Sequence, residues 1–364
     1  MTTIKNVGLE QWNIGVELGK PLFISGPCSA ETEEQVLETC IRLAKKPLVH
    51  ILRAGIWKPR TRPNSFEGVG SIGLQWLKEA GKETGLPVCT EVANAKHVYE
   101  ALRMGIDILW IGARTTVNPF AVQEIADALV GVDIPVMVKN PVNPDLELWI
   151  GALERLNYAG IFKLAAIHRG FSTYGKHKYR NRPQWEIPIE LMRRFPDLPI
   201  ICDPSHICGT REYLSDIAQK AMDLNFTGLM IESHINPSKA LSDAEQQLVP
   251  EMYHQLIEGL VMRSSTSADQ TFLHNLEELR EIINEFDDKI IELIGQRMNV
   301  SKQIGRFKKA TGITILQSAR WDEIIHTRCE HGLKVGLSLE FTEALYNAIH
   351  KESIQHQASV MYDK

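Results

Sequence analysis

Eight short apolar segments, separated by amphipathic stretches, fill the first 260 residues and constrain the fold more than any other feature of this sequence. They span residues 21–25, 49–53, 87–92, 108–112, 134–139, 161–167, 199–203 and 228–233. Segments that are apolar throughout are typical of strands buried on both faces of a parallel sheet. Eight βα units within about 240 residues therefore predict an α/β TIM barrel, (β/α)8, rather than an open doubly wound sheet.

The charge balance and the cysteines limit the partners and the compartment. Forty basic and 45 acidic residues give a formal net charge of −5 and an isoelectric point near 6.2. This balance excludes a general attraction to nucleic acid or to an anionic membrane, so we expect neither as a partner. No apolar run approaches the ~20 residues of a membrane span, and residues 1–6 lack a signal-peptide pattern. Six scattered cysteines without a Cys-x-x-Cys pair predict a reduced, cytoplasmic protein.

Polar side chains follow every one of the eight predicted strands, at the end of the barrel where such enzymes hold their chemistry. One such residue is usually a solvated loop charge, but eight converging positions indicate a site. The cationic members are Arg53, Lys58, Arg60, Arg114, Lys139 and Arg169. Because crowded cations repel one another and bind phosphate and carboxylate oxygens well, they predict a polyanionic ligand with more than one phosphate.

A second group of strand-end residues carries metal-binding chemistry. Its members are Cys28, His206, Glu232 and Asp243. A thiolate, an imidazole and two carboxylates suit a divalent transition metal with an open coordination position. Manganese is our first choice, and Fe, Co or Zn would suit the same donors. The alternative, which the residues leave open, is an anion-binding barrel without catalysis.

Four motifs in the barrel resemble those of 3-deoxy-D-arabino-heptulosonate-7-phosphate (DAHP) synthases, in the subgroup shared with 3-deoxy-octulosonate-8-phosphate synthases. They are Gly-Pro-Cys-Ser at 26–29, Lys-Pro-Arg-Thr at 58–61, Gly-Ala-Arg at 112–114 and Asp-Pro-Ser-His at 203–206. The resemblance covers about residues 20–250. It implies a metal-dependent condensation of phosphoenolpyruvate with erythrose 4-phosphate at the start of the shikimate pathway. The Lys-Pro-Arg-Thr stretch favours the four-carbon sugar.

The same resemblance assigns roles to single residues. It makes Cys28, His206, Glu232 and Asp243 the metal ligands. It places Arg53, Lys58, Arg114, Lys139 and Arg169 around phosphoenolpyruvate, and Arg60 with Thr61 on the phosphate of erythrose 4-phosphate. Lys58, Glu91 and Lys139 are the implied catalytic groups, with Glu91 and Lys139 positioning the attacking water.

Residues 263–271 are small and polar, and they predict a linker between a barrel domain at 1–262 and an all-α domain at 272–364. Beyond the linker, apolar residues recur at helical spacing. We expect one helix of about 35 residues that ends at Gly312, a second from about 318 to 331 that Gly332 ends, and a third from about 338 to 358. A helix as long as the first needs partner helices.

Two cations on the long helix have a spacing that suits a small dianion. Arg297 and Lys308 are 11 residues apart, which is about three turns, so their side chains point the same way. Arg280 lies too far along the helix to join them, but it would reach the equivalent pocket of a second, antiparallel chain. Arginine and lysine close on carboxylates in such pockets.

The pattern from residue 273 to 358 resembles the all-α chorismate mutase, an intertwined helical dimer, and implies rearrangement of chorismate to prephenate. The implied chorismate contacts are Arg280 (from the second chain), Arg297, Lys308, Arg320, Ser353 and Gln357. Lys308 and Gln357 would face the breaking ether oxygen. Trp321 stands where many relatives carry a glutamate.

These observations predict a homo-oligomer, at least a dimer through the helical domain, with both activities in one chain. The small-molecule partners are phosphoenolpyruvate, erythrose 4-phosphate and chorismate, with prephenate as a product and inhibitor. Feedback inhibition by prephenate or chorismate is expected because the sequence shows no other regulatory module. The alternative keeps the synthase and makes the helical domain a sensor without useful turnover.

Overall fold

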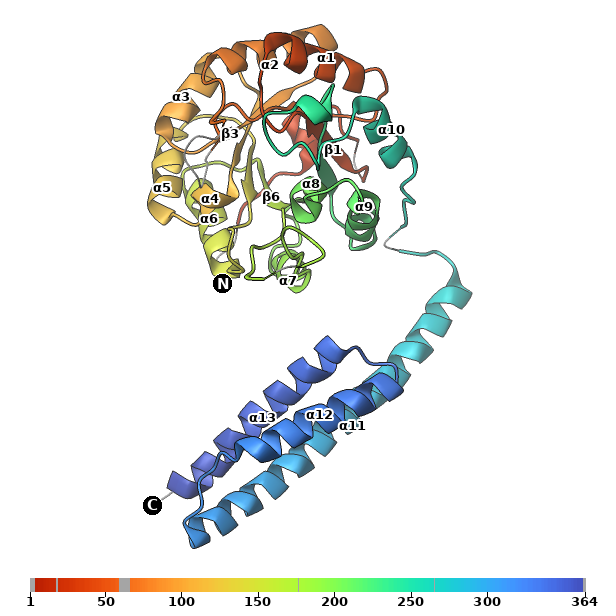
Figure 1. Ribbon diagram of the computed structural model, residues 1–364. Coiled ribbons are helices and arrows are strands. Elements are labelled where there is room, and N and C mark those ends of the chain that lie inside the picture. The colour runs from red at the N-terminus through yellow and green to blue at the C-terminus, as the bar shows by residue number, and fades with distance from the viewer. Residues whose placement is uncertain (1–3, 18, 59–65, 176, 265, 363–364) are drawn as a thin grey trace. The chain divides into compact units, whose positions relative to one another are not determined.

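The structure is a computed structural model that describes residues 4–17, 19–58, 66–175, 177–264 and 266–362. The chain divides into two compact units, Met1–Ser265 and Thr266–Lys364. Figure 1 shows the first as a ring of helices around strands and the second as a group of helices. Within the described residues, no helix is both long and apolar enough to span a membrane.

The first unit is a closed parallel barrel in which each strand pairs with the next and β8 pairs with β1. The strands are β1 Leu22–Gly26, β2 Ile51–Arg53, β3 Val88–Val92, β4 Ile108–Ile111, β5 Val136–Lys139, β6 Leu164–His168, β7 Ile200–Cys202 and β8 Gly228–Glu232. Almost every strand residue is buried, as expected for strands packed on both faces. The predicted TIM barrel is confirmed, and each strand lies within three residues of its predicted bounds.

Helices cover the outside of the barrel (Figure 1). They are α1 Glu33–Leu43, α2 Ile72–Thr84, α3 Ala95–Arg103, α5 Pro119–Ala128, α6 Leu146–Tyr158, α7 Glu186–Arg194, α9 Leu214–Asp223 and α10 Pro250–Glu258. Two short helices, α4 Ala113–Thr116 and α8 Pro204–Cys208, instead follow the carboxyl ends of β4 and β7. Polar caps fix several of their starts, and Thr32 accepts a hydrogen bond from the Gln35 amide at the start of α1.

Two apolar layers hold the barrel together. One lies between the strands and the helices, and it includes Leu52 and Trp149. The other fills the inside of the barrel around Trp110, and the N-terminal segment adds Leu9 and Trp12 of the short helix η1, Leu9–Trp12, to it. A filled interior leaves the strand ends as the place where polar groups can gather.

The second unit consists of α11 Gln270–Thr311, α12 Ser318–Lys334 and α13 Leu339–Tyr362. The long first helix ends as predicted, because Gly312 adopts a left-handed backbone with φ of 67°. The prediction that Gly332 ends α12 is wrong. A Cβ at Gly332 would lie 2.3 Å from Thr342 Oγ1, so this glycine allows α12 to approach α13, and the chain turns only at Gly336.

One face of α11 is apolar and largely exposed within this chain. Phe286, Ile290 and Leu293 keep 58%, 52% and 63% of their surface accessible, and Met298 is among the few buried residues of this helix. A continuous exposed apolar face of this kind marks an interaction surface.

Candidate functional site

Three donor atoms converge at the carboxyl ends of the barrel strands. The Cys28 sulfur and one oxygen each of Glu232 and Asp243 all lie within 4.8 Å of one another. Cys28 follows β1 and Glu232 ends β8. The turn after β1 depends on Gly26, since its φ is 148° and a Cβ there would lie 2.0 Å from the Arg53 carbonyl oxygen. Strand closure between β1 and β8 thus brings the sulfur to the carboxylates.

The Cys28 thiol is fully buried in a polar environment. Lys58 Nζ lies 2.9 Å from Cys28 Sγ and donates to the Cys28 carbonyl oxygen at 3.0 Å. The sulfur is 3.2 Å from Asp243 Oδ2. Burial and the charge of Glu232 raise the pKa of Cys28 to about 12, so the group is a neutral thiol in this arrangement. A divalent cation at these donors would displace that proton.

His206, on the short helix α8, lies beside Glu232 but is not one of the three residues whose donor atoms lie within 4.8 Å of one another. Its Nε2 is 3.8 Å from Glu232 Oε1, and its Nδ1 is 2.8 Å from Asp203 Oδ2. Asp203 also caps α8 by accepting from the His206 amide at 3.1 Å. Although burial opposes it, the charges of His206 and Lys139 lower the pKa of Asp203 well below its usual range. Nδ1 makes no hydrogen bond of good geometry among the described residues despite its short distance from Asp203, and Nε2 is the ring nitrogen that faces Glu232.

The residues present fit a divalent cation. Glu232 Oε1 is fully buried and has no hydrogen-bond partner among the described residues. The nearby charged nitrogen is Arg53 Nη2, at 3.2 Å. This buried oxygen is compensated by an ion pair and accepts no hydrogen bond among the described residues, so it has a lone pair available for a cation. Sulfur, nitrogen and oxygen donors together suit manganese, iron, cobalt or zinc.

Buried cations surround this point, as the sequence predicts for a polyanion site. Arg53 stacks over Trp110 at 4.8 Å, and its Nε and Nη1 have no hydrogen-bond partner among the described residues. Lys139 Nζ is 2.7 Å from Asp203 Oδ2. Burial lowers the pKa of Arg169 to about 10, with Arg180 contributing in the same direction. Arg53 has nitrogen donors without hydrogen-bond partners among the described residues, and Arg169 lies close enough to Arg180 for their charges to repel. Both features indicate a site for an anionic ligand.

Glu91 and Arg114 come from neighbouring strand ends. Trp110 Nε1 donates to Glu91 Oε2 at 2.9 Å, and Gly112 leaves room for this carboxylate, since a Cβ there would lie 2.2 Å from Glu91 Oε1. Arg114 is exposed on α4. The predicted Arg60 and Thr61 lie outside the described residues.

Three further residues belong to this site, although sequence reasoning did not select them. Arg180 Nη1 is 2.8 Å from Asp243 Oδ1, Asn181 Oδ1 accepts from Arg169 Nη1 at 2.7 Å, and Gln246 Nε2 donates to Glu232 Oε2 at 2.6 Å. They lie in irregular segments without a motif, so no sequence signal marked them. Asp203 stood in a recognised motif, but its contact with His206 needed the structure.

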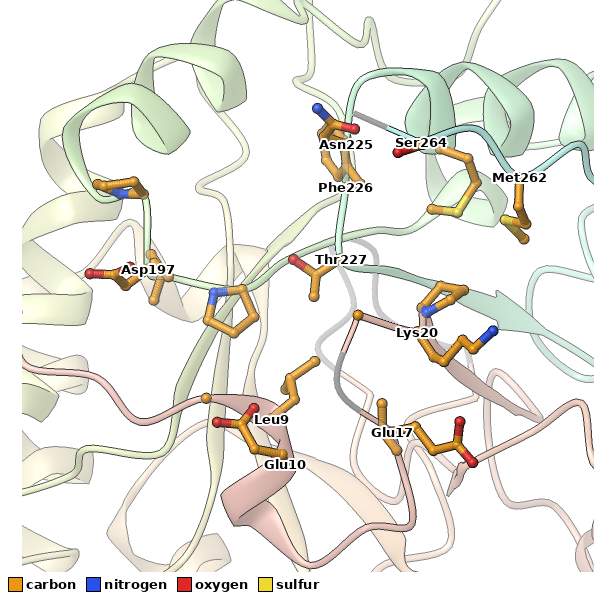
Figure 2. A pocket seen from close by; sticks show the side chains of 18 of the residues that line it. Leu9, Glu10, Glu17, Lys20, Asp197, Asn225, Phe226, Thr227, Met262 and Ser264 are labelled. Atoms are coloured by element: carbon orange, nitrogen blue, oxygen red, sulfur yellow. The ribbon is translucent and has the colours of Figure 1, made fainter. Parts of the chain in front are cut away.

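The opposite end of the barrel holds a cavity of about 610 Å³. Figure 2 shows its labelled lining, which includes Leu9, Lys20, Thr227 and Met262. Thr227 directly precedes β8, so the cavity lies at the amino ends of the strands. It contains none of the predicted site residues and is separate from the candidate site.

In the helical unit, α11 and α13 bring three predicted residues together. Arg297 Nη1 donates to Ser353 Oγ at 2.5 Å. Gln357 lies close to Gly305, where a Cβ would be 3.0 Å from Gln357 Cα, and Gln357 Oε1 is buried without a hydrogen-bond partner among the described residues. Burial lowers the pKa of Arg297. The half-buried guanidinium and, one helical turn beyond its partner Ser353, the unsatisfied amide oxygen of Gln357 are groups suited to bind an anion with hydroxyl groups.

The other predicted residues of this unit have different partners. Lys308 Nζ donates to the Ile315 carbonyl oxygen at 2.6 Å. Arg280 and Arg320 are exposed and pair with glutamates on their own helices, at 3.8 and 2.6 Å. Trp321 stacks on His350 with ring centroids 3.9 Å apart. This arrangement leaves Arg280 and Arg320 outside the pocket formed by one chain.

Comparisons with known proteins agree with this division. The model of the DAHP synthetase I family matches residues 6–265, and that of chorismate mutase type II matches residues 279–358. Phospho-2-dehydro-3-deoxyheptonate aldolase of Thermotoga maritima is 33% identical over 247 residues, which are 67% of this chain and 71% of that protein. The 2-dehydro-3-deoxyphosphooctonate aldolase of Desulfotalea psychrophila is 29% identical, covering 72% of this chain and 97% of that protein.

Solved structures give the same relationship for the barrel. The crystal structure of the Thermotoga maritima DAHP synthase superposes with a TM-score of 0.62 at 30% identity, covering 70% of this chain and 72% of that one. A truncated form of the Thermotoga maritima enzyme gives a TM-score of 0.57 at 29% identity, covering 67% of this chain and 88% of that one.

Proposed function

Since the chain belongs to the DAHP synthetase I family and carries a chorismate mutase type II domain, we propose that it catalyses two reactions of aromatic biosynthesis. The barrel condenses phosphoenolpyruvate, erythrose 4-phosphate and water to DAHP and inorganic phosphate, and it depends on a divalent metal ion. The helical unit converts chorismate to prephenate. The observation that carries the barrel reaction is the convergence of Cys28, Glu232 and Asp243 donor atoms within 4.8 Å, among buried cations.

In this proposal, Cys28, His206, Glu232 and Asp243 hold the metal ion, with manganese as our first choice. When bound, a divalent cation polarises the aldehyde oxygen of the sugar phosphate. The chain's own cations orient phosphoenolpyruvate: Arg53 and Lys58 lie beside the donors, and Arg114, Lys139 and Arg169 hold its phosphate. Positioning two anionic substrates in this way removes several kcal/mol of the barrier, on the order of 7 kcal/mol in good cases.

Two residues on β3 and β5, the strands on either side of β4, are the proposed proton-transfer groups. We assign to Glu91 and Lys139 the positioning and deprotonation of the water that adds to the phosphate-bearing carbon. Trp110 Nε1 donates to the Glu91 carboxylate at 2.9 Å, and Lys139 Nζ donates to Asp203 Oδ2 at 2.7 Å. Arg60 and Thr61 are proposed to bind the phosphate of erythrose 4-phosphate.

Phosphate release from phosphoenolpyruvate tests the barrel reaction. The full chain, freed of metal by chelation, would be assayed with four- and five-carbon aldose phosphates, with and without added Mn²⁺. We expect phosphate release only with metal and a preference for the four-carbon sugar. Undiminished activity after chelation would reject the metal requirement. A preference for the five-carbon sugar would instead assign the phosphooctonate reaction named for the Desulfotalea psychrophila relative.

For the helical unit we propose that Arg297, Lys308, Ser353 and Gln357 bind chorismate in one chain, with Arg320, while Arg280 comes from a second copy. The exposed apolar face of α11 supports a dimer, because a second copy would cover it. Placing positive charge beside the breaking ether oxygen favours the compact transition state without a nucleophile.

Regulation completes the proposal. Prephenate or chorismate bound to the helical unit inhibits condensation if it binds better in one arrangement of the two units. Deleting residues 264–364 should abolish this inhibition.

The second candidate function is a sensor without useful turnover, favoured by Trp321 at the position of a glutamate. No conversion of chorismate, combined with inhibition of condensation by chorismate, would decide for the sensor. We place both reactions in the cytoplasm, where six unpaired thiols remain reduced.

A further inference from the structure

Arg180 reaches from the segment between β6 and α7 to the loop that follows β8. Its backbone amide donates to the Cys208 carbonyl oxygen at 3.3 Å. Gly209 leaves room for its side chain, because φ there is 71° and a Cβ would lie 2.6 Å from Arg180 Cβ. The guanidinium is therefore placed by its own segment and by the end of α8, rather than by the loop that it contacts.

The first contact of this guanidinium selects one oxygen of Asp243. Arg180 Nη1 is 2.8 Å from Asp243 Oδ1. The other oxygen, Oδ2, is left 3.2 Å from Cys28 Sγ. Asp243 has a left-handed backbone with φ of 48°, a conformation that aspartate tolerates better than most residues with a side chain. A salt bridge on Oδ1 fixes a carboxylate that would otherwise rotate.

The second contact selects one oxygen of Glu232 through an intermediate residue. Arg180 Nη1 donates to Gln246 Oε1 at 3.0 Å, and Gln246 Nε2 donates to Glu232 Oε2 at 2.6 Å. Because arginine only donates, it forces the amide of Gln246 to present its NH2 group to Glu232. Glu232 Oε1 is the oxygen that remains without a hydrogen-bond partner among the described residues.

We propose that Arg180 is a positioning residue for the divalent-cation site, because one guanidinium nitrogen determines which oxygen of Asp243 and of Glu232 faces the ion. This inference rests on the metal requirement of the proposed function. It also predicts the sign of an effect. The positive charge of Arg180 repels a divalent cation, so its removal alone would tighten binding. Loss of positioning would weaken binding.

Titration of Mn²⁺ into the chelator-treated full chain, followed by isothermal titration calorimetry, tests the proposal. We expect Arg180→Gln to weaken Mn²⁺ binding about 10- to 100-fold, as loss of an outer-shell partner does in other metal sites. Arg211→Gln is the matched control. Arg211 Nη1 anchors the same loop by donating to the carbonyl oxygens of Ala244 and Gln247, at 3.1 and 3.0 Å, without touching a proposed ligand. This control should bind Mn²⁺ as the wild type does.

A second variant, Gln246→Leu, keeps the proposal testable if Arg180→Gln does not fold. It should also weaken Mn²⁺ binding, and the double variant should be little worse than Arg180→Gln alone, because Gln246 acts on Glu232 through the same guanidinium. Unchanged or tighter Mn²⁺ binding by a folded Arg180→Gln, or an equal loss in Arg211→Gln, would overturn the proposal. A wild-type chain that binds no Mn²⁺ would refute the metal requirement itself, and this inference with it.

Discussion

The barrel and the helical unit hold their site residues in opposite ways. In the barrel, Cys28 and Glu232 are fully buried at the ends of paired strands, and neighbouring side chains within the unit orient them. In the helical unit, the side chains of Arg280 and Arg320 are 62% and 61% exposed. The comparison teaches that the barrel buries its proposed ligands within one chain, whereas the three long helices leave two of the proposed chorismate-binding arginines exposed.

The largest expected effect tests the barrel half of this contrast. Replacing Cys28 with alanine should lower the condensation rate at least about 100-fold, because the sulfur is a proposed ligand and no neighbouring group can take its place. The chorismate reaction should not change. Both rates would be measured on the full chain with added Mn²⁺.

Cys40 provides the matched control for this change. Both thiols are fully buried, and burial raises the pKa of each to about 12, but Cys40 lies on α1 away from the carboxylates. Cys40→Ala should keep the condensation rate. Equal activity of the two variants would remove Cys28 from the site.

The next effect tests whether the helical unit needs a second copy. Phe286 is 58% exposed on the apolar face of α11. Phe286→Glu would place a charge in the proposed dimer interface of each chain, and losing one buried aromatic per chain, at about 1.5–3 kcal/mol each, should lower the chorismate rate about 100-fold. Sedimentation velocity should show loss of the dimer, while condensation per chain stays unchanged.

Asp288→Asn changes an exposed residue of the same helix and serves as the control. It should leave both assembly and the chorismate rate as they are. A Phe286→Glu chain that remains dimeric with full chorismate activity would show that this face of α11 is not the interface.

The acid sensitivity of the two units should also differ. Burial lowers the pKa of His168 to about 3, among rings that include Trp185 and Phe171. An unfolded chain binds a proton at this histidine below about pH 6.5, and the folded barrel does not. Stability is therefore unaffected above that pH and falls as the pH decreases from 6.5 towards 3, by about 2 kcal/mol at pH 5.

Urea unfolding at about pH 7.5 and pH 5, followed by tryptophan fluorescence, measures this loss of unfolding free energy at low pH. In His168→Phe, the difference in unfolding free energy between the two pH values should be about 2 kcal/mol smaller than in the wild type. This comparison holds even if the substitution changes the unfolding free energy equally at both pH values. The exposed His326 of the helical unit is the control, and His326→Gln should not change the pH dependence. An unchanged pH dependence in His168→Phe would contradict the prediction.

The barrel could be predicted from sequence because strands buried on both faces leave an unmistakable pattern of apolar runs. The proposed ligands could be predicted for a related reason, since Cys28 and Glu232 stand at the ends of such runs. Arg180 and Gln246 could not, because their contacts depend on side-chain directions in irregular loops. Gly332 shows why the end of α12 could not be predicted. Glycine is favoured both where a helix ends and where a helix packs closely against another, and sequence alone does not distinguish the two.

The smallest expected effect concerns the wall of the helical pocket. Trp321 stacks on His350 with ring centroids 3.9 Å apart, and burial and then the charge of Arg297 lower the pKa of that histidine. Trp321→Glu would supply a carboxylate that accepts a substrate hydroxyl, and one such hydrogen bond should raise kcat/KM for chorismate up to about tenfold. Trp321→Phe keeps an aromatic ring without an acceptor and should give no gain. A Trp321→Glu chain that is no faster than Trp321→Phe would mean that the missing acceptor does not limit the rate at the helical site.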